Sequence, residues 1–456
     1  MRDLQQLLSN VKKTENGDIS FQSLDDKMLN ILFKAEYYTH HLDNVPELSV
    51  SDLSGVFAMF MRDPRNGLGW KDLGRHLMKM TGIPYEYIAF AGRYDDIWKM
   101  YLNNKFAQNF LKKECAKGNE LCKKWMPRYS SKNLMAARTL AKAWGMNKQQ
   151  YGHFIKCNTT EQHLSRKNYD DIKFEQVPSL ASIKYAHTFS TKEELKERYA
   201  EYLEDVKSGK KKLNISTTTP YDIYKNRTTI DADLFFDKLE KISGNWIPIV
   251  DTSGSMRNSY DAMGKALSIG HYLAKCSTYA PNQVISFSSS PSILKLGEEN
   301  TYYNYYNYNG NMKTQYLKGI EGQYNREIES MYTGDCSNTD FGAVMEKLRA
   351  LKNDAPEYLI VLSDMEFDMG SSMSKDTTMK MFKDNGFNTK IIWWNFNDRN
   401  QTCPETDEYG NIFMSGYSPM LLKYLESGFD GKQFLNKLLK EYVCYMANNI
   451  TQSVII

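Results

Sequence analysis

One short stretch near the middle of the chain constrains the fold more than any other. The run Trp246–Val250 is apolar, partly β-branched and bounded, which is typical of a buried strand, and it ends in Asp251. Ser253 and Ser255 follow at alternate positions. Open α/β sheets bind ligands at the carboxyl ends of their strands, so we expect these side chains to converge there. One carboxylate with small neutral oxygens suits Mg²⁺ or Mn²⁺ better than zinc.

Two later segments supply matching oxygen donors. Thr339 and Asp340 precede a helical pattern over 341–348, and the apolar run 358–362 is followed two residues later by Asp364. An acid, two hydroxyls, a later Thr and a later Asp, in this order, resemble the metal-ion-dependent adhesion site of von Willebrand factor A domains. The resemblance implies a site for Mg²⁺ or Mn²⁺ built from Asp251, Ser253, Ser255, Thr339 and Asp364.

The acidic residues of these segments also have simpler interpretations. Asp251 and Asp364 can each cap the helix that follows its strand; the complete set of donors in the expected order favours the metal site. Asp340 is either a helix cap or an outer ligand, and Glu366 and Asp368 are expected on the loop surface. The resembled site leaves its ion under-neutralised, so it implies that an acidic group of a protein partner fills the open position.

Catalytic constellations are weak in this sequence. Phosphatases that form an aspartyl phosphate need a second acid two residues after the first, and Ser253 stands there. The seven histidines form no visible arrangement with Ser or Cys and an acid, and no GxxxxGK[ST] loop exists. We therefore expect a binding protein that is not an enzyme.

Strand and helix patterns alternate from about residue 231 onward, which predicts a doubly wound, mainly parallel sheet. The expected strands are 246–250, 283–287, 292–296, 357–362 and 389–396. The expected helices between and after them are 259–278, 314–330, 340–352, 374–384, 419–427 and 431–446. Ser288–Pro291 indicates a hairpin and hence one antiparallel edge strand, and Pro248 is expected at a strand start, where no ladder bond is lost.

The front half shows successive amphipathic helices instead. The clearest spans 192–207, where Thr191 and Glu194 form a capping-box pattern. A segment at 27–42 behaves similarly, and paired helices predict an all-helical, HEAT-like repeat module. The expected fold class is therefore α plus α/β. The predicted domains are a polar segment, a helical module and a von Willebrand factor A-like domain, at 1–23, 24–230 and 231–456.

Part of the helical region resembles a second family. The stretch Phe60–Asp72 is similar to the Arg-Asp-x-Arg-Gly-Gly-x-Gly segment of the Ro ribonucleoprotein (TROVE) proteins, with Pro64 and Asn66 departing from that pattern. It is closer to a group of plant, phage and giant-virus proteins without an assigned function, which segments 92–96 and 394–398 also resemble. The resemblance implies a helical repeat module followed by a von Willebrand factor A domain, with RNA as a partner.

Positive charge is concentrated in residues 101–150, which hold 11 basic and 2 acidic residues. Such a stretch either neutralises phosphates, with salt-dependent binding, or forms a solvated helix face. Arg62 and Arg65 either contribute to the same surface or pin neighbouring helices together. The candidate nucleic-acid-binding residues are Arg62, Arg65, Lys112, Lys113, Lys123, Lys124, Arg128, Lys132 and Arg138.

The remaining features bound the environment of the protein. No run of about 18 apolar residues and no signal-peptide core is present, and the seven cysteines form no framework, so we expect a cytoplasmic protein without membrane contact. The Tyr/Asn-rich tract 302–310 either stacks on bases or forms a solvated loop. Two hypotheses follow: a ribonucleoprotein component with a metal-dependent protein-binding module, or a protein–protein or viral assembly scaffold without nucleic acid.

Overall fold

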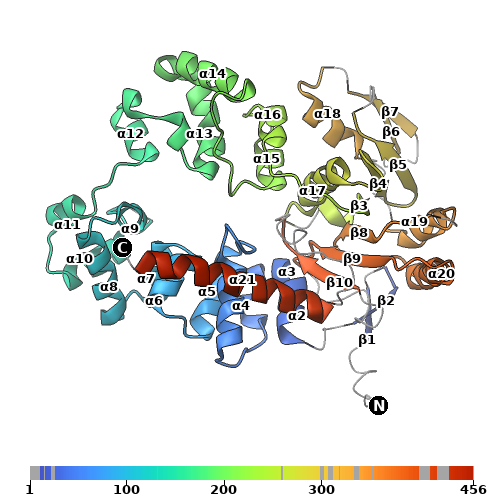
Figure 1. Cartoon of the computed structure of the whole chain (residues 1–456), viewed down its shortest axis with the longest axis horizontal. Helices are drawn as coiled ribbons and strands as arrows, with labels where there is room; N and C mark the ends of the chain where they lie inside the picture. Colours follow the sequence, from blue (N-terminus) through green and yellow to red (C-terminus); the bar gives the residue numbers. More distant parts are fainter. Residues whose placement is uncertain are drawn as a thin grey trace. The chain divides into compact units, whose positions relative to one another are not determined.

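In the computed structural model the chain forms two compact units. Figure 1 shows its helices and strands, coloured along the sequence. The first comprises Met1–Pro46 and Thr218–Leu438, and the second comprises Glu47–Thr217 and Leu439–Ile456. The units interleave along the chain, whereas the sequence analysis predicts consecutive domains. The described residues are 11–14, 16–21, 26–130, 132–257, 260–297, 302–306, 312–317, 319–332, 338–351, 354–399, 411–417 and 431–454.

A mixed six-stranded sheet forms the centre of the first unit, in the order β10-β9-β8-β3-β4-β5. Its strands are β3 (Trp246–Asp251), β4 (Gln283–Phe287), β5 (Pro291–Lys295), β8 (Tyr358–Ser363), β9 (Lys390–Asn395) and β10 (Ile412–Ser415). Neighbouring strands are parallel except β4 and β5, which pair antiparallel. The predicted strands and the antiparallel edge are therefore confirmed. Strand β10 was not predicted, because only four residues form it.

Pro248 lies inside β3 and not at its start, which corrects the prediction. It pairs with Ile360 of β8, but the ladder between β3 and β4 begins only at Ile249. The proline precedes the first residue of that ladder, so the β3–β4 pairing loses no hydrogen bond.

Helices cover both faces of this sheet. On one face, α17 (Ala262–Cys276) packs so closely that a Cβ built on Gly270 would lie 2.4 Å from Val250 Cγ2. On the other face, Phe341 of α19 (Phe341–Leu348) lies 5.4 Å from Trp393, ring centroid to ring centroid. Trp393 is in register with Val361, which is in register with Ile249. Ile249 precedes Val250, and successive side chains of a strand point to opposite faces, so α17 and α19 lie on opposite faces of the sheet.

The first unit contains further elements around the sheet. They are β1 (Val11–Lys13), β2 (Ile19–Phe21), α2 (Lys27–Phe33), α3 (Ala35–His40), η1 (Leu42–Asn44), α15 (Pro220–Asn226), α16 (Ala232–Asp237), η4 (Ser255–Arg257), β6 (Tyr302–Tyr306), β7 (Met312–Tyr316), α18 (Gln323–Ser330) and α20 (Ser371–Asp384). The predicted helix 314–330 is wrong in its first half, because β7 pairs with β6 and Gly319 and Gly322 adopt positive φ before α18 begins. The predicted helix 419–427 and residues 307–310 of the Tyr/Asn-rich tract lie outside the described residues.

The segment predicted as the first helix of the helical module packs against the sheet instead. It forms two helices, α2 and α3, and Phe33 of α2 lies 5.2 Å from Phe413 of β10, ring centroid to ring centroid. The backbone N–H of Glu36 donates to Ser415 Oγ at 3.1 Å, and Asn395 Nδ2 donates to the Phe33 carbonyl at 3.3 Å. The N-terminal residues therefore cover the ends of β9 and β10.

The second unit is helical in its described part. Its elements are α4 (Asp52–Arg62), α5 (Lys71–Met80), α6 (Tyr85–Ala91), α7 (Tyr94–Tyr101), α8 (Lys105–Ala116), α9 (Glu120–Trp125), α10 (Leu134–Ala143), α11 (Lys148–Phe154), α12 (Thr160–Arg166), η2 (Tyr169–Asp171), η3 (Phe174–Gln176), α13 (Ser179–Thr191), α14 (Glu193–Lys207) and α21 (Gly431–Val454) from Leu439 onward. The predicted capping box is wrong: Thr191 ends α13, where its Oγ1 donates to the His187 carbonyl at 2.7 Å. No helix among the described residues is long and apolar enough to cross a membrane.

Candidate functional site

A tight turn follows β3 and brings three polar side chains together. Asp251 Oδ1 accepts a hydrogen bond from the backbone N–H of Ser253 at 2.9 Å, which folds the chain back over the strand end. The hydroxyl oxygens of Ser253 and Ser255 lie 3.0 Å apart. The N–H of Thr252 donates to the carbonyl of Phe287 in β4 at 2.8 Å, which anchors the turn to the neighbouring strand.

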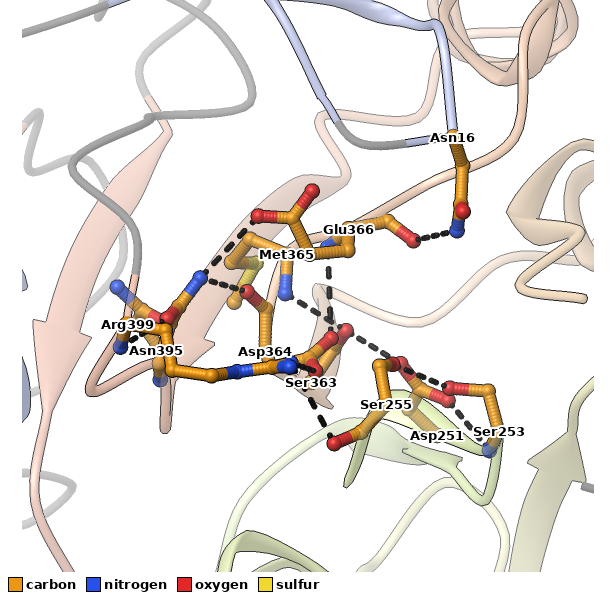
Figure 2. Close-up of polar contacts among 11 residues, drawn as sticks. Asn16, Asp251, Ser253, Ser255, Ser363, Asp364, Met365, Glu366, Asn395 and Arg399 are labelled. Carbon is orange, nitrogen blue, oxygen red and sulfur yellow. Dashed lines mark hydrogen bonds and ion pairs between the residues drawn. The ribbon is translucent and has the colours of Figure 1, made fainter. Parts of the chain in front are cut away.

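The end of β8 reaches the same point (Figure 2). The Ser363 hydroxyl donates to Asp251 Oδ2 at 2.5 Å and accepts the N–H of Met365 at 2.9 Å. Met365 has φ +66°, a conformation that costs about 1–3 kcal/mol for a residue other than glycine and is concentrated at functional sites. This bend follows Asp364 directly, so the two acids that end β3 and β8 are held at one edge of the sheet.

The carboxyl groups of Asp251 and Asp364 are fully buried, and burial is the largest influence on the pKa of each. Burial raises the pKa of Asp251, although hydrogen bonds from Ser363 and Ser253 act in the opposite direction. Burial and the charge of Asp251 raise the pKa of Asp364, against the Ser255 hydroxyl and the Arg399 guanidinium. Two buried acids that repel each other favour a further cation between them.

Thr339 and Asp340 lie at the same edge of the sheet. The N–H of Asp340 donates to the Ser288 carbonyl after β4 at 3.0 Å, and the N–H of Asp368 donates to the Thr339 carbonyl at 2.9 Å. The Thr339 side chain is buried. Asp340 caps α19, since its Oδ1 accepts the N–H of Ala343 at 2.9 Å, and this supports the cap interpretation of that residue.

Glu366 was expected on the loop surface, and this expectation is wrong because the side chain is buried. Asn397 Nδ2 donates to Glu366 Oε1 at 3.3 Å and to the Asp364 carbonyl at 2.9 Å. Asn16 of the N-terminal hairpin donates to the Glu366 carbonyl at 2.8 Å. Asp368 is half-buried. The loop after β8 is thus tied down on both sides of Asp364.

Sequence reasoning missed three residues of this site: Ser363, Asn397 and Arg399. Ser363 is the last residue of β8, and its position before Asp364 was the available signal. The other two follow β9, the parallel neighbour of β8, so their strand also ends at this edge. Segment 394–398 stood out in the sequence as a resemblance, but only the pairing of β8 with β9 connects it with the two acids.

The donor set fits a hard divalent cation. Asp251, Ser253, Ser255 and Asp364 present carboxylate and hydroxyl oxygens, and Thr339 lies at the same edge. Oxygen ligands of this kind suit Mg²⁺ and Mn²⁺. The described residues contain no cluster of three or more His, Cys, Asp or Glu side chains arranged for a metal. A metal held here would therefore depend on hydroxyl oxygens and water in addition to the two carboxylates.

Arg62 is wrongly placed among the nucleic-acid-binding candidates. Its side chain is 3% exposed and forms an ion pair with Asp96 of α7, with Nη2 2.7 Å from Oδ2. A Cβ built on Gly74 of α5 would lie 2.7 Å from Arg62 Cα, so α5 crosses directly over this residue. Arg62 therefore pins three helices together, which was the alternative interpretation.

The rest of the Ro-like segment shapes the turn between α4 and α5. The Asp63 carboxylate accepts the N–H of Arg65 at 2.8 Å and the hydroxyl of Tyr442 at 3.0 Å. A Cβ built on Gly67 would lie 1.9 Å from the Phe60 carbonyl oxygen, so only glycine fits there. These contacts give the segment a structural role within the helical unit.

The other basic candidates divide into two groups. Lys112, Lys123, Lys124 and Arg128 are half-buried and use donors inside the unit, on the Trp144 carbonyl, Glu120, Glu161 and the carbonyls of Ile155 and Lys123. The exposed candidates are Arg65, Lys113, Lys132 and Arg138. Among the candidates, only these four exposed side chains present their charge to solvent.

Comparisons with known proteins place these units in context. The domain of unknown function DUF7788 matches residues 245–442, and the domain of unknown function DUF2828 matches residues 121–254. An uncharacterized protein, L728, of Acanthamoeba polyphaga mimivirus is 24% identical over 366 residues, which are 71% of this chain and 61% of that protein. This chain thus spans 61% of the length of that relative. The crystal structure of the Deinococcus radiodurans Ro (RSR) protein aligns with a TM-score of 0.39 and 11% identity, covering 94% of this chain and 96% of that one.

Proposed function

We propose that the protein is a non-enzymatic binding protein whose α/β unit holds Mg²⁺ or Mn²⁺ and uses the ion to bind an acidic group of a protein partner. The observation that carries the proposal is the meeting of Asp251, Ser253, Ser255 and Asp364 at the ends of β3 and β8. Thr339, at the same edge, would supply the third hydroxyl. The proposed set resembles the donor set of a von Willebrand factor A adhesion site, in the same chain order.

The residues themselves favour binding over catalysis. Both oxygens of Asp251 accept hydrogen bonds, from Ser253 N–H and from Ser363 Oγ, and the second acid that phosphatases forming an aspartyl phosphate need two residues later is replaced by Ser253. The neutral hydroxyls leave a bound dication only partly neutralised, and the ion would offer an open position to a carboxylate. Asp251 and Asp364 would anchor the ion, directly or through water.

Calorimetric titration with MnCl₂ tests the metal site. The wild-type protein should bind one ion, and Asp251→Ala should abolish the binding heat. Asp376→Ala is the matched control, because it removes an acid of the same unit that lies in α20, is 54% exposed and pairs with Lys375. Wild-type protein that binds no Mn²⁺, or Asp251→Ala that binds it normally, would contradict the proposal.

A second candidate function is RNA binding by the helical unit. A groove of about 1240 Å³ between α6 and α8 is lined by aromatic side chains, including Tyr87 and Phe106, which are 37% and 78% exposed. Lys113 lines the same groove and is exposed. Aromatic faces beside lysines suit unpaired bases and phosphates, since stacking contributes about 1–3 kcal/mol per base. The exposed Lys132 and Arg138 extend the positive charge along the same basic stretch.

Fluorescence anisotropy of a labelled single-stranded RNA tests this second function. We expect binding at 50 mM salt that weakens steeply toward about 200 mM, as counterion release requires. Phe106→Ala and Lys113→Glu should each weaken it, whereas Lys210→Glu, in the exposed turn after α14, should act less. Absence of RNA binding at low salt, with metal binding intact, would support the alternative of a protein–protein or viral assembly scaffold.

A further inference from the structure

The guanidinium of Arg399 lies beside Asp364, the acid that follows β8 (Figure 2). Its Nη2 is 3.4 Å from Asp364 Oδ2 and 3.5 Å from the carbonyl oxygen of Ser255. Arg399 is 34% exposed, whereas Asp364 is 0% exposed. A partly solvated cation thus contacts one predicted metal ligand and the backbone of another.

We infer that Arg399 is an internal cation that competes with the divalent ion for Asp364 and so sets the affinity of the site. This inference rests on the proposed metal-binding function and assigns its regulation to a residue of this chain. When a metal binds, the Asp364 oxygen exchanges a singly charged guanidinium for a doubly charged ion.

The surroundings allow the guanidinium to leave while the loop stays in place. The N–H of Arg399 donates to Asn397 Oδ1 at 2.8 Å, and Asn397 Nδ2 holds the Asp364 carbonyl at 2.9 Å. The N–H of Phe396 donates to the Ser363 carbonyl at 3.0 Å. None of these three hydrogen bonds involves the guanidinium, so the long side chain of Arg399 can turn toward solvent without moving the acid.

The competition works in two ways. While the guanidinium pairs with Asp364, it lies against Oδ2, one of the two oxygens that this acid could offer to a metal. After it turns away, it still carries a positive charge near the ion, which repels a dication in a poorly solvated site. Both effects weaken metal binding, so a protein without this charge should bind the ion more tightly. A partly exposed pair of this geometry contributes modestly, and we expect a change of about two- to fivefold in affinity.

Titration calorimetry with MnCl₂ on the full chain tests the inference, with three proteins compared. Arg399→Gln removes the charge and keeps a polar side chain, and its Kd for Mn²⁺ should fall about two- to fivefold below the wild-type value. Arg326→Gln, on the exposed side of α18, is the matched control and should leave Kd unchanged. Circular dichroism melting of each variant checks that the fold is retained.

The outcomes separate this inference from the function on which it rests. Wild-type binding with an equal or higher Kd for Arg399→Gln would overturn the role of Arg399 and leave the metal site standing. Tighter binding in both arginine variants would show a general charge effect and would also overturn it. No Mn²⁺ binding by any of the three proteins would overturn the metal site itself.

Discussion

Removal of Arg62 alone should destabilise the helical unit strongly, because it leaves a buried carboxylate without its main partner. Asp96 is 0% exposed, and Arg62 Nη2 lies 2.7 Å from it. Loss of one member of such a pair costs about 3–5 kcal/mol. Arg75 Nε, 3.5 Å from the other Asp96 oxygen, and the Arg93 N–H, at 3.0 Å, still compensate the charge in part. We therefore expect Arg62→Met to cost about 3 kcal/mol, at the lower end of that range.

Neutralising both partners should restore much of this loss. Burial lowers the pKa of Arg62 and raises the pKa of Asp96, so for each group desolvation outweighs the attraction between them. A pair of this kind contributes little beyond what well-packed neutral side chains would. Asp96→Asn keeps an oxygen for the Arg93 N–H, and the double variant with Arg62→Met should recover about half of the loss or more.

Calorimetric melting and hydrogen exchange measured by mass spectrometry provide the assay. A loss of about 3 kcal/mol corresponds to a fall of roughly 6–12 °C in Tm for a unit of this size. Exchange should accelerate in peptides from α4 and α7, while peptides from β3 and β8 serve as an internal reference. An Arg62→Met protein with unchanged Tm and weakened RNA binding would refute the structural role assigned to this arginine.

Three further predictions concern the α/β unit. Burial raises the pKa of Glu327, but hydrogen bonds from His271 and Lys275 outweigh it and hold the pKa at about 2. The Glu327 carboxylate therefore contributes its full stabilisation above the ordinary carboxyl pKa of about 4.3, and this stabilisation is lost as the pH falls toward 2. Glu327→Gln should flatten the dependence of the urea midpoint on pH between these two values. Gly270→Ala should cost about 1–3 kcal/mol by overpacking α17 on β3, and a normal urea midpoint would contradict that packing. The control for this substitution is Gly152→Ala in α11 of the helical unit, whose Cβ would meet nothing within 4 Å, and it should be neutral or stabilise by up to about 1 kcal/mol. Ser363→Ala removes the donor to the first acid of the site and should weaken Mn²⁺ binding about tenfold in calorimetry, so unchanged affinity would deny it a supporting role.

The sheet and its polar edge could be predicted because their signals are local. A short apolar run ending in an acid defines both β3 and β8, and parallel strands bring such ends together without further information. The hairpin of β4 and β5 follows equally from its serine-rich turn. The contact between Arg399 and Asp364 could not be predicted in this way, because it depends on which strand lies beside β8.

The assignment of the helical segments to units was less accessible for a related reason. Residues 27–42 have helical periodicity, but periodicity does not reveal that α2 packs on β10, a strand too short to be recognised. The burial of Arg62 was equally hidden, since an arginine in a basic sequence gives the same signal whether it faces solvent or a carboxylate on another helix. The packing of α2 and the burial of Arg62 both depend on contacts between residues that belong to different helices and strands.

The most direct test of the metal site is the anomalous difference density of a crystal grown with Mn²⁺. We expect one peak among the oxygens of Asp251, Ser253, Ser255, Thr339 and Asp364, with the hydroxyl oxygens in contact with the ion and the Arg399 guanidinium turned away from Asp364. A peak elsewhere, or a peak that the Ser253 and Ser255 hydroxyls do not contact, would contradict this expectation.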